Sequence, residues 1–503
     1  MRRTNLISIV GALATIAGVS SCDSFLDPSP SDVLTPENFY HTSSDAVAAV
    51  NGVYEQVKWS YWLGFWYISD IATDDIFAAP RFGSDGHRMS DWIFDATEWP
   101  MGDMWGSAYR IINRANVVLD RVPAITMDPA LRARVLGEAH FLRALAYFDL
   151  VRCFGDVPLI EHEVKSLDGL RVSRTPAAQV QALILSDLQE AIPALPPSYS
   201  GADVGRVTRG AAQALLAKVY LTAKDWTNAA ALAGQVMASQ RYTLLPSWKD
   251  NYKIATKIVN SESIFEINYD GVLDPGSGSV HTLFSLPSGF PGGDAYGLMT
   301  VAPSLANLFA ASDTRGLGGT FIVSDTAKPY VDALGDTVTW ADPPAKLGPA
   351  FIKYLDQTDF QNMHTRAWVR QANDWIVLRY ADVLLMYAEA VNEGGTATAG
   401  TAEAALNLVR VRAGISPVSG LSQSAFRDSV RLDRRREFVF EGQRFFDLVR
   451  WGALDSAIRA KTAELHAIDS LEVPIPHGIR GSLLPIPLSE LNINPNLTQN
   501  PGW

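Results

Sequence analysis

The chain has 503 residues, of which 47% are hydrophobic, and a formal net charge of −12. This acidic balance argues against a nucleic-acid partner, which would require a basic face. No segment beyond the N-terminal region has the roughly 18 uninterrupted apolar residues of a membrane span, so the sequence predicts no transmembrane helix.

Residues 1–21 have the layout of a secretory signal peptide. Met1-Arg2-Arg3 is a short basic start, and residues 6–19 form an apolar run that is too short to cross a membrane. Val19-Ser20-Ser21-Cys22 then resembles a bacterial lipobox, in which the thiol takes a diacylglyceryl group and becomes the first mature residue. The alternative is an ordinary cleavage site with a coincidental cysteine. We expect acylation of Cys22, because it falls at the junction itself and no partner thiol is close.

Removal of this segment would leave one unmodified thiol, that of Cys153. The mature chain could then form no internal disulfide. Cys153 lies in an apolar helical run, which favours a small buried core residue. Loss of the two arginines would shift the formal charge from −12 to −14.

Start and stop signals mark helices along the first half of the chain. Thr35, Asp128 and Thr175 are capping residues that each precede a proline, as at a helix start. Gly155 should end the third helix, and Pro158 should prevent its renewal. Apolar residues recur at helical spacing over residues 46–57, 103–121, 129–154 and 176–188.

Two later segments read as pairs of helices joined by short turns. Residues 209–239 have the offsets of a tetratricopeptide pair, with a turn at Lys224-Asp225 and a small residue, Ala229, where the second helix must approach closely. Residues 381–393 and 402–414 form a second pair with a longer turn. We therefore predict a mainly α fold built on tetratricopeptide-like helical pairs.

The pattern changes between about residues 240 and 370. Ser263–Tyr269 is a short alternating strand candidate, and Gly- and Pro-rich segments follow it. We expect one mature domain over 22–503: a helical scaffold at about 35–240 and 370–460, this loop-rich insert with a few short strands, and an extended tail at about 470–503. Long loops in a compact domain often carry function.

Several segments together resemble the SusD/RagB family of nutrient-binding outer-membrane lipoproteins. Two of them, GEAHFLRALAYFDLVRCFGDVPLI and RRREFVFEGQRFFDLVRWG, match it most strongly. The segments that carry the resemblance are residues 22–32, 35–40, 108–120, 137–160, 379–393, 406–414, 434–452 and 483–503. The resemblance implies a helical scaffold with an irregular binding face. It also implies capture of oligosaccharides or other nutrients at the cell surface, and delivery to a SusC-like TonB-dependent transporter in the outer membrane.

The charged segment 434–452 favours a structural role over catalysis. Glu437 and Glu441 would share one helical face, and arginines lie three residues from acidic partners. Such spacing predicts an ion-pair network that packs this helix against its neighbours. The expected pairs are Arg434–Glu437, Glu441–Arg444 and Asp447–Arg450.

The sequence gives no positive indication of an enzyme. It has no nucleophile elbow, P-loop or dinucleotide fingerprint, and its eight histidines show no metal-ligand spacing. Carboxylates that could serve a glycosidase are present, but sequence cannot show two of them facing each other across a cleft. We predict no cofactor; the absence of an EF-hand-like motif leaves bound calcium undecided.

A sugar site needs flat apolar ring faces together with polar partners for hydroxyl groups. Aromatic residues are concentrated at 59–99, and again at 284–299 and near Trp340. Helical spacing favours burial of Trp59, Trp62, Phe65 and Trp66. The predicted ligand-binding residues are Asp74, Asp75, Arg81, Trp92, Trp99, Phe290, Tyr296 and Trp340.

Three functions therefore remain open from the sequence. The first is a surface-anchored binding protein that does not cleave its ligand. The second is a lipid-anchored hydrolase acting on the same polymers, and the third is a helical-repeat scaffold that binds only protein. The first is the function that the family resemblance implies.

Overall fold

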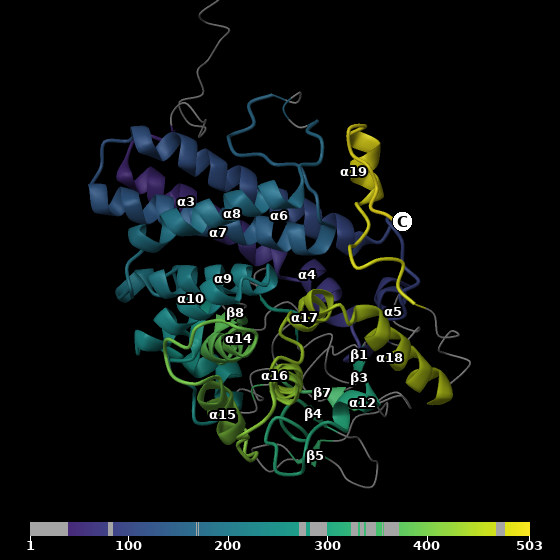
Figure 1. Ribbon diagram of the computed structural model, residues 1–503. Helices are drawn as coiled ribbons and strands as arrows, with labels where there is room; N and C mark the ends of the chain where they lie inside the picture. The colour runs from purple at the N-terminus through teal and green to yellow at the C-terminus, as the bar shows by residue number, and fades with distance from the viewer. Residues whose placement is uncertain are drawn as a thin grey trace, which may run out of the picture.

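The computed structural model shows a mainly α-helical chain arranged in stacked layers of helices (Figure 1). It describes residues 39–78, 84–166, 169, 171–270, 278–281, 299–322, 330–331, 337–338, 349–354, 356, 372–468 and 478–503. The signal segment and Cys22 lie outside these residues. No helix in the described part of the chain is both long and apolar enough to cross a membrane.

The upper layer of Figure 1 contains four long helices. They are α3 (Ser43–Ser60), α6 (Trp99–Arg121), α7 (Pro129–Phe154) and α8 (Ala177–Ala194). Asp128 caps α7 as predicted by accepting a hydrogen bond from the Leu131 N–H, and Gly155 ends that helix with φ 72°. Helix α3 begins at Thr42, whose side chain and that of Asp45 form a reciprocal capping box. The predicted cap at Thr35 lies outside the described residues, and α6 begins four residues earlier than predicted.

Both predicted helical pairs are present and pack against each other. Helices α9 (Arg209–Thr222) and α10 (Trp226–Ala238) turn at Lys224, which has φ 61°. Helices α14 (Tyr380–Asn392) and α15 (Ala402–Arg412) form the second pair. Helix α10 lies against α14, and the small residue Ala229 of α10 is buried. The tetratricopeptide-like scaffold is confirmed.

Short strands lie in and beside the insert. The predicted strand is β2 (Ser263–Ile267), which pairs antiparallel with β8 (Trp375–Arg379). A four-stranded sheet has the order β1-β3-β7-β4, with β1 at Ile76–Ala78, β3 at Met299–Val301, β7 at Ala350–Phe351 and β4 at Phe321–Ile322. Strands β5 (Tyr330–Val331) and β6 (Thr337–Val338) pair separately. The shorter helical elements here are η6 (Trp248–Tyr252), η7 (Ile254–Val259) and α12 (Pro303–Ala306).

The charged segment 434–452 does form a buried ion-pair network, but it is not one continuous helix. Helix α16 (Gln423–Glu437) ends before Phe440 and Gly442, which have φ 63° and 70°, and α17 (Arg444–Trp451) begins after them. This break changes the expected pairing. Arg434 pairs with Asp447 and Asp382, Arg444 pairs with Asp74, and the predicted Asp447–Arg450 pair is present at 2.9 Å.

The C-terminal segment follows α18 (Leu454–Ile468) and contains one short helix, α19 (Leu488–Ile493), which the sequence did not predict. The tail folds back on the end of α7. The Leu484 N–H donates to the Cys153 carbonyl at 2.8 Å, and the Asn500 amide donates to the carbonyl of Phe154 at 3.0 Å. Cys153 is fully buried, as expected.

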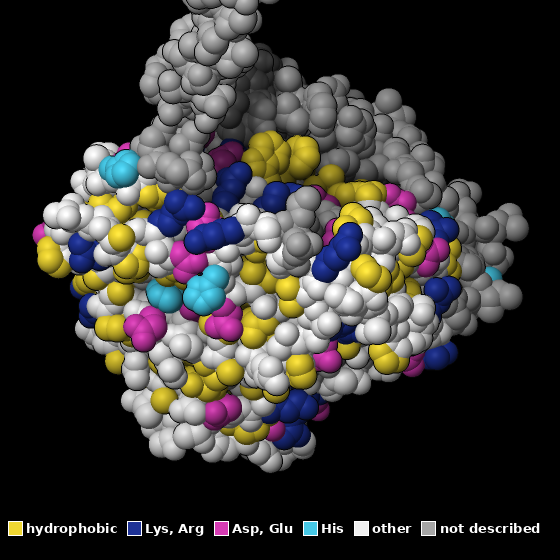
Figure 2. All heavy atoms as spheres, turned by 90° about the horizontal axis from the view of Figure 1, so that it is seen from above, with side chains coloured by type: hydrophobic (Ala, Val, Ile, Leu, Met, Phe, Trp, Pro, Cys, Tyr) yellow, Lys and Arg dark blue, Asp and Glu magenta, His cyan; other side chains and the backbone are white. Residues whose placement is uncertain are grey.

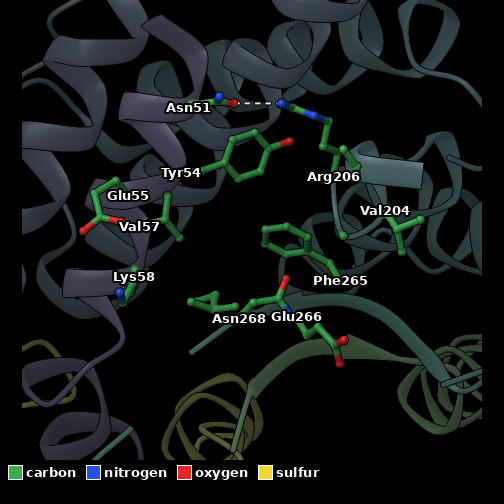
Figure 3. A pocket seen from close by; sticks show the side chains of 13 residues that line it. Asn51, Tyr54, Glu55, Val57, Lys58, Val204, Arg206, Phe265, Glu266 and Asn268 are labelled. Carbon is green, nitrogen blue, oxygen red and sulfur yellow. Dashed lines mark hydrogen bonds between the residues drawn. The ribbon is translucent and has the colours of Figure 1, made fainter. Parts of the chain in front are cut away.

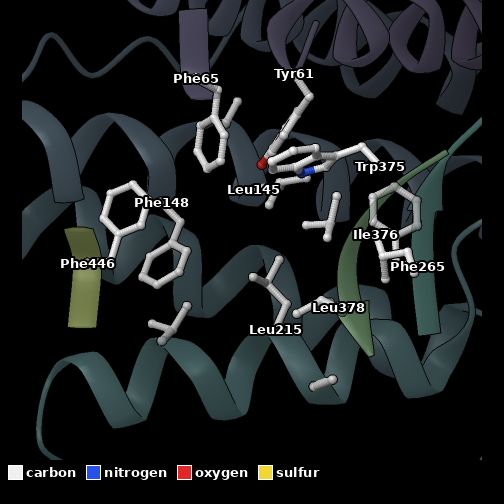
Figure 4. Packing of buried hydrophobic residues seen from close by; sticks show 14 of the residues in the cluster. Tyr61, Phe65, Leu145, Phe148, Leu215, Phe265, Trp375, Ile376, Leu378 and Phe446 are labelled. Atoms are coloured by element: carbon white, nitrogen blue, oxygen red, sulfur yellow. The ribbon is translucent and has the colours of Figure 1, made fainter. Parts of the chain in front are cut away.

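Aromatic side chains from distant segments meet in the core between the upper layer and α17 (Figure 4). Phe65 packs on Phe446 and Trp375, with ring centroids 5.8 and 6.4 Å apart. The Arg152 guanidinium lies between the rings of Phe148 and Phe446, 4.1 and 3.6 Å from their centroids. The short elements α4 (Gly64–Trp66), η1 (Tyr67–Ile71) and α5 (Ser84–Ser90) connect this core to the small sheet.

Candidate functional site

Asp74 and Asp75 are buried partners of arginines and present no carboxylate to a ligand. Arg444 Nε lies 2.8 Å from Asp74 Oδ1, and Arg435 Nε lies 2.7 Å from Asp75 Oδ1. Burial alone would raise the pKa of Asp74, but the guanidinium groups of Arg444 and Arg435 hold it well below its usual range. These two predicted ligand residues are corrected to structural ones, because their charges are already neutralised inside the protein.

Trp92 is also a core residue rather than a ligand-binding one. Its side chain is 1% exposed, and its indole N–H donates to the Ala72 carbonyl at 3.2 Å. Its ring lies parallel to that of Phe445 at 6.5 Å. Trp99, in contrast, is 37% exposed at the start of α6, and its ring contacts Tyr67 edge to face.

The remaining predicted ligand-binding residues fall outside the described part of the chain. They are Arg81, Phe290, Tyr296 and Trp340, and the predicted lipid-attachment residue Cys22 lies outside it as well. The chain enters the segment that bears Phe290 and Tyr296 directly after residues 278–281.

Trp59, at the end of α3, is exposed, although helical spacing predicts its burial. Phe65 and Trp66 are buried as predicted and Trp62 is half-buried, but Trp59 is 39% exposed. The periodicity of α3 contained the signal that identifies Trp59. Ala46, Val50, Val53 and Val57 form its buried stripe, and a residue two positions beyond Val57 falls about 200° around the helix.

A pocket of about 270 Å³ is lined by the neighbouring α3 residues Glu55 and Lys58 but not by Trp59 itself (Figure 3). It lies between α3, the loop before α9 and the C-terminal part of β2. Its lining residues are Asn51, Tyr54, Glu55, Val57, Lys58, Ala202, Val204, Gly205, Arg206, Phe265, Glu266, Ile267 and Asn268. Gly205 has φ 97°, and a Cβ atom there would lie 2.9 Å from Asn268 Oδ1, so the close approach of the loop to β2 requires glycine.

Arg206 and Tyr54 form rigid walls of the pocket. Arg206 donates to Asn51 at 2.8 Å, to Glu138 at 2.9 Å and to Asp203 at 2.6 Å. The Tyr54 hydroxyl accepts the Val207 N–H at 3.0 Å. These bonds fix the two side chains before any ligand arrives, which lowers the entropy cost of binding.

Two side chains that line the pocket, Glu55 and Lys58, also lie next to the indole of Trp59. Its N–H donates to Glu55 Oε1 at 3.0 Å, and the Lys58 ammonium lies 5.9 Å from its ring centroid. Lys58 forms no ion pair with the other described residues. One carboxylate and one ammonium therefore remain next to an exposed ring face.

Glu266 contributes a different kind of polar group. Burial, together with the nearby Asp374 carboxylate, raises the pKa of Glu266 to about 8. The Lys257 ammonium is bonded to Asp374 at 2.9 Å and does not neutralise Glu266 directly. At neutral pH Glu266 is thus a protonated carboxyl that can both donate and accept hydrogen bonds.

A described segment, residues 278–281, lies beside the end of α3. The Trp62 indole N–H donates to the Gly278 carbonyl at 3.0 Å, and this contact fixes residues 278–281 beside the end of α3.

Within the described part of the chain, no group of three or more His, Cys, Asp or Glu side chains is arranged to hold a metal ion.

The face seen from above in Figure 2 has no large region of a single charge. Lys and Arg side chains alternate there with Asp and Glu, between patches of hydrophobic side chains. An exposed indole beside a pocket of amides, carboxyls, one ammonium and the Arg206 guanidinium, which is already paired with Glu138 and Asp203, suits a neutral, hydroxyl-rich ligand better than a polyanion.

Comparison with known proteins identifies the family. A family model described as "SusD family" matches residues 345–503, and one described as "Starch-binding associating with outer membrane" matches residues 24–221. A SusD-like protein of Formosa agariphila is 29% identical, with 99% of each chain covered. A structure named a laminarin binding SusD-like protein is 27% identical, with a TM-score of 0.76, over 92% of this chain and 100% of the other.

A further structure, surface glycan-binding protein A from Bacteroides uniformis, is 25% identical with a TM-score of 0.76, over 92% of this chain and 100% of the other. The matched segments at both ends of the chain, the helical-pair scaffold and these full-length similarities agree. The chain belongs to the SusD/RagB family.

Proposed function

We propose that this protein binds oligosaccharides at the outer membrane without cleaving them. The observation that carries the proposal is the exposed indole of Trp59 beside a preformed polar pocket, in a chain of the SusD/RagB family. The names of two relatives, laminarin binding and surface glycan-binding, support a glycan as the ligand class.

In this proposal the ring of Trp59 stacks on the C–H face of a sugar. Glu55, Lys58 and Asn51, which all line the pocket on α3, bind the sugar's hydroxyl groups. Each stacked ring contributes only about 1 kcal/mol, so we expect modest affinity for short glycans. Trp99, Arg81, Phe290, Tyr296 and Trp340 remain proposed contributors to the same or an adjoining surface.

We further propose that Cys22 is acylated, that the protein faces the cell exterior, and that it delivers its ligand to a SusC-like TonB-dependent transporter. More than one acyl chain is needed for stable anchoring, which a diacylglyceryl group supplies. A labelled fatty acid should join the wild type but not Cys22→Ser, and Cys22→Ser should leave the envelope fraction. Envelope retention of an unlabelled Cys22→Ser protein would reject the anchor. Co-purification of a transporter with the tagged wild type tests the partner.

The binding test uses soluble protein lacking residues 1–22 and a glycan panel on a retention column or in calorimetry. We expect retention without new reducing ends, and a loss of about fivefold in affinity for Trp59→Ala. Leu408→Ala is the matched control, because Leu408 is an exposed apolar residue on α15, away from the pocket. New reducing ends would favour the hydrolase, and binding of protein alone would favour the scaffold.

Alanine variants of the other proposed contributors extend this test. Trp99→Ala, Trp340→Ala and Tyr296→Ala should each weaken retention if their rings take part in one binding face. Unchanged retention in all three, with loss in Trp59→Ala, would confine the site to the α3 pocket.

A further inference from the structure

A second pocket, of about 200 Å³, adjoins the first on the other side of the loop before α9. Its lining comes from the loop between α8 and α9, the segment after α10, Asn260 and the residues of β2 from Ser263 to Glu266. The residues that line both pockets are Val204, Gly205, Arg206, Phe265 and Glu266. The two pockets therefore share the loop residues Val204–Arg206, which form a common wall, and the β2 residues Phe265 and Glu266.

Three tyrosines define this double pocket, and each is fixed through its hydroxyl. The Val207 N–H donates to the Tyr54 hydroxyl, and the Tyr199 hydroxyl donates to the Val207 carbonyl, both at 3.0 Å. The Tyr242 hydroxyl lies 3.0 Å from that of Thr208. One short backbone segment thus orients an aromatic ring in the first pocket and two in the second.

The polar groups of the second pocket resemble those of the first in kind. Arg241, an exposed residue, lines it together with Asn260, which precedes β2, and Ser263, the first residue of β2. Glu266, which accepts the Ser263 hydroxyl at 2.8 Å, lies between the pockets and offers hydrogen-bonding atoms to both. Rigid rings alternating with amide, hydroxyl and carboxyl groups suit linked sugar units, each with one apolar face and several hydroxyls.

We propose that the two pockets are consecutive subsites of one groove, and that the ligand is a saccharide chain long enough to pass from Tyr54 over the Val204–Arg206 wall to Tyr242. The inference rests on the proposed glycan-binding function and extends it. It assigns Tyr199, Arg241 and Tyr242 to ligand binding and makes chain length the property that the protein selects. Tight binding requires both subsites to be filled at once, because each ring contact alone is weak.

The test measures affinity by calorimetry for malto- and laminari-oligosaccharides from two to about eight units. For the wild type we expect affinity to rise about tenfold or more between the shortest ligands and those that fill both pockets. Ser198→Trp fills the second pocket from an exposed position that does not line the first. This variant should bind short chains like the wild type and lose the gain for long chains.

Ser200→Trp is the matched control, since Ser200 is exposed two residues further on and lines neither pocket. Arg241→Ala, at an exposed side chain, is a second probe that should lower long-chain affinity about threefold, without risk to the fold. Retention of the length dependence in Ser198→Trp and Arg241→Ala, both folded by circular dichroism, would overturn the second subsite and leave the proposed function standing. A wild type that binds no saccharide of any length would overturn both.

Discussion

Arg379 shows how single residues hold the interior of this protein together. Its guanidinium, 2% exposed, donates to Glu262 at 2.8 Å, to Glu437 at 2.6 Å and to Glu441 at 2.7 Å. Lys353 also pairs with Glu441, inside the same core. A buried charge is tolerated only when it is paired and hydrogen-bonded, so the carboxylates depend on this arginine.

Removal of Arg379 should therefore be far more costly than removal of a surface arginine. We expect Arg379→Met to lower the free energy of unfolding by about 3–5 kcal/mol, because three buried carboxylates lose one of the cations that balance their charge. Arg459→Met is the control; Arg459 forms an exposed pair with Asp455 at 2.8 Å and should cost less than about 1 kcal/mol. Denaturant unfolding measures both, and equal losses would contradict the structural role of the network.

The buried carboxyl group of Asp70 should make the folded protein less stable as pH rises. Burial raises the pKa of Asp70 from 3.8 to about 8. Between these values the folded state binds a proton that the unfolded state has lost, so the free energy of unfolding falls as pH rises from about 4 to 8. Asp70→Asn keeps an acceptor for the Gly442 N–H, which lies 3.0 Å from Asp70 Oδ2. The difference in stability between Asp70→Asn and wild type should grow with pH across this window; a constant difference in pH-dependent unfolding would reject the shift.

The candidate site was only partly predictable residue by residue. Sequence composition placed Asp74 and Asp75 among polar residues and suggested ligand contacts. Their partners Arg435 and Arg444 lie about 360 residues later, and nothing local indicates that they meet. Tyr54 and Arg206 were missed for the same reason, since their pocket exists only where α3, a loop and β2 come together.

At the scale of elements, the break between α16 and α17 decides which charges meet. A continuous helix would have placed Glu441 beside Arg444, whereas the turn at residues 438–443 directs Glu441 towards Arg379 and Arg444 towards Asp74. Gly442 makes this turn in the left-handed region, where a Cβ atom would lie 2.8 Å from the Phe65 ring and 3.0 Å from that of Trp375.

Gly442 and Gly452 both have a positive φ, but only Gly442 is tightly packed against other side chains. Comparing them separates the cost of backbone strain from the cost of a steric clash. Gly452, which follows α17, has φ 67°, and a Cβ atom added there would have no neighbouring atom within 4 Å. We expect Gly452→Ala to cost about 1 kcal/mol through the positive φ alone. Gly442→Ala should cost at least about 3 kcal/mol, because the core rings must also move. Thermal or denaturant unfolding compares the two, and similar losses would show that Phe65 and Trp375 yield easily.

Helices were more predictable than their connections. The cap and stop of α7 and the turn at Lys224-Asp225 are local signals, and the structure confirms them, whereas the predicted cap Thr175 is replaced by Pro176 at the start of α8. The break after Glu437 was hidden, because Phe440 adopts φ 63° without being glycine. Strand β8 was missed because WIVLR carries no turn signal before α14 and is buried throughout.

At the scale of the whole molecule, the C-terminal segment folds back and binds the end of α7. Asn500, 2% exposed, donates to the carbonyls of Phe154 and Leu484, and Arg174 donates to the Asn500 side chain at 2.5 Å. This one amide joins the end of α7 to the tail and to the segment before α8.

Loss of that amide should loosen the tail and destabilise the protein. We expect Asn500→Ala to cost about 1–3 kcal/mol, because the Leu484 carbonyl loses the Asn500 amide and the Phe154 carbonyl keeps only Arg174, at 3.3 Å. Asn496→Ala removes an exposed amide that bonds the Arg171 carbonyl and should cost less than about 1 kcal/mol. Hydrogen exchange should show faster opening of residues 483–500 in Asn500→Ala alone; unchanged exchange would deny the tail its closing role.

The docking of the tail also sets an order of events during folding. Asn500 and Phe154 are separated by 346 positions, so a pairing of very high contact order must form after nearly all of the chain has been synthesised. Until then the Cys153 carbonyl in the last turn of α7 lacks its Leu484 N–H donor, and the Phe154 carbonyl has only Arg174. Maturation should therefore finish in a single late step, at the moment when the far end of the polypeptide returns to its first long helices.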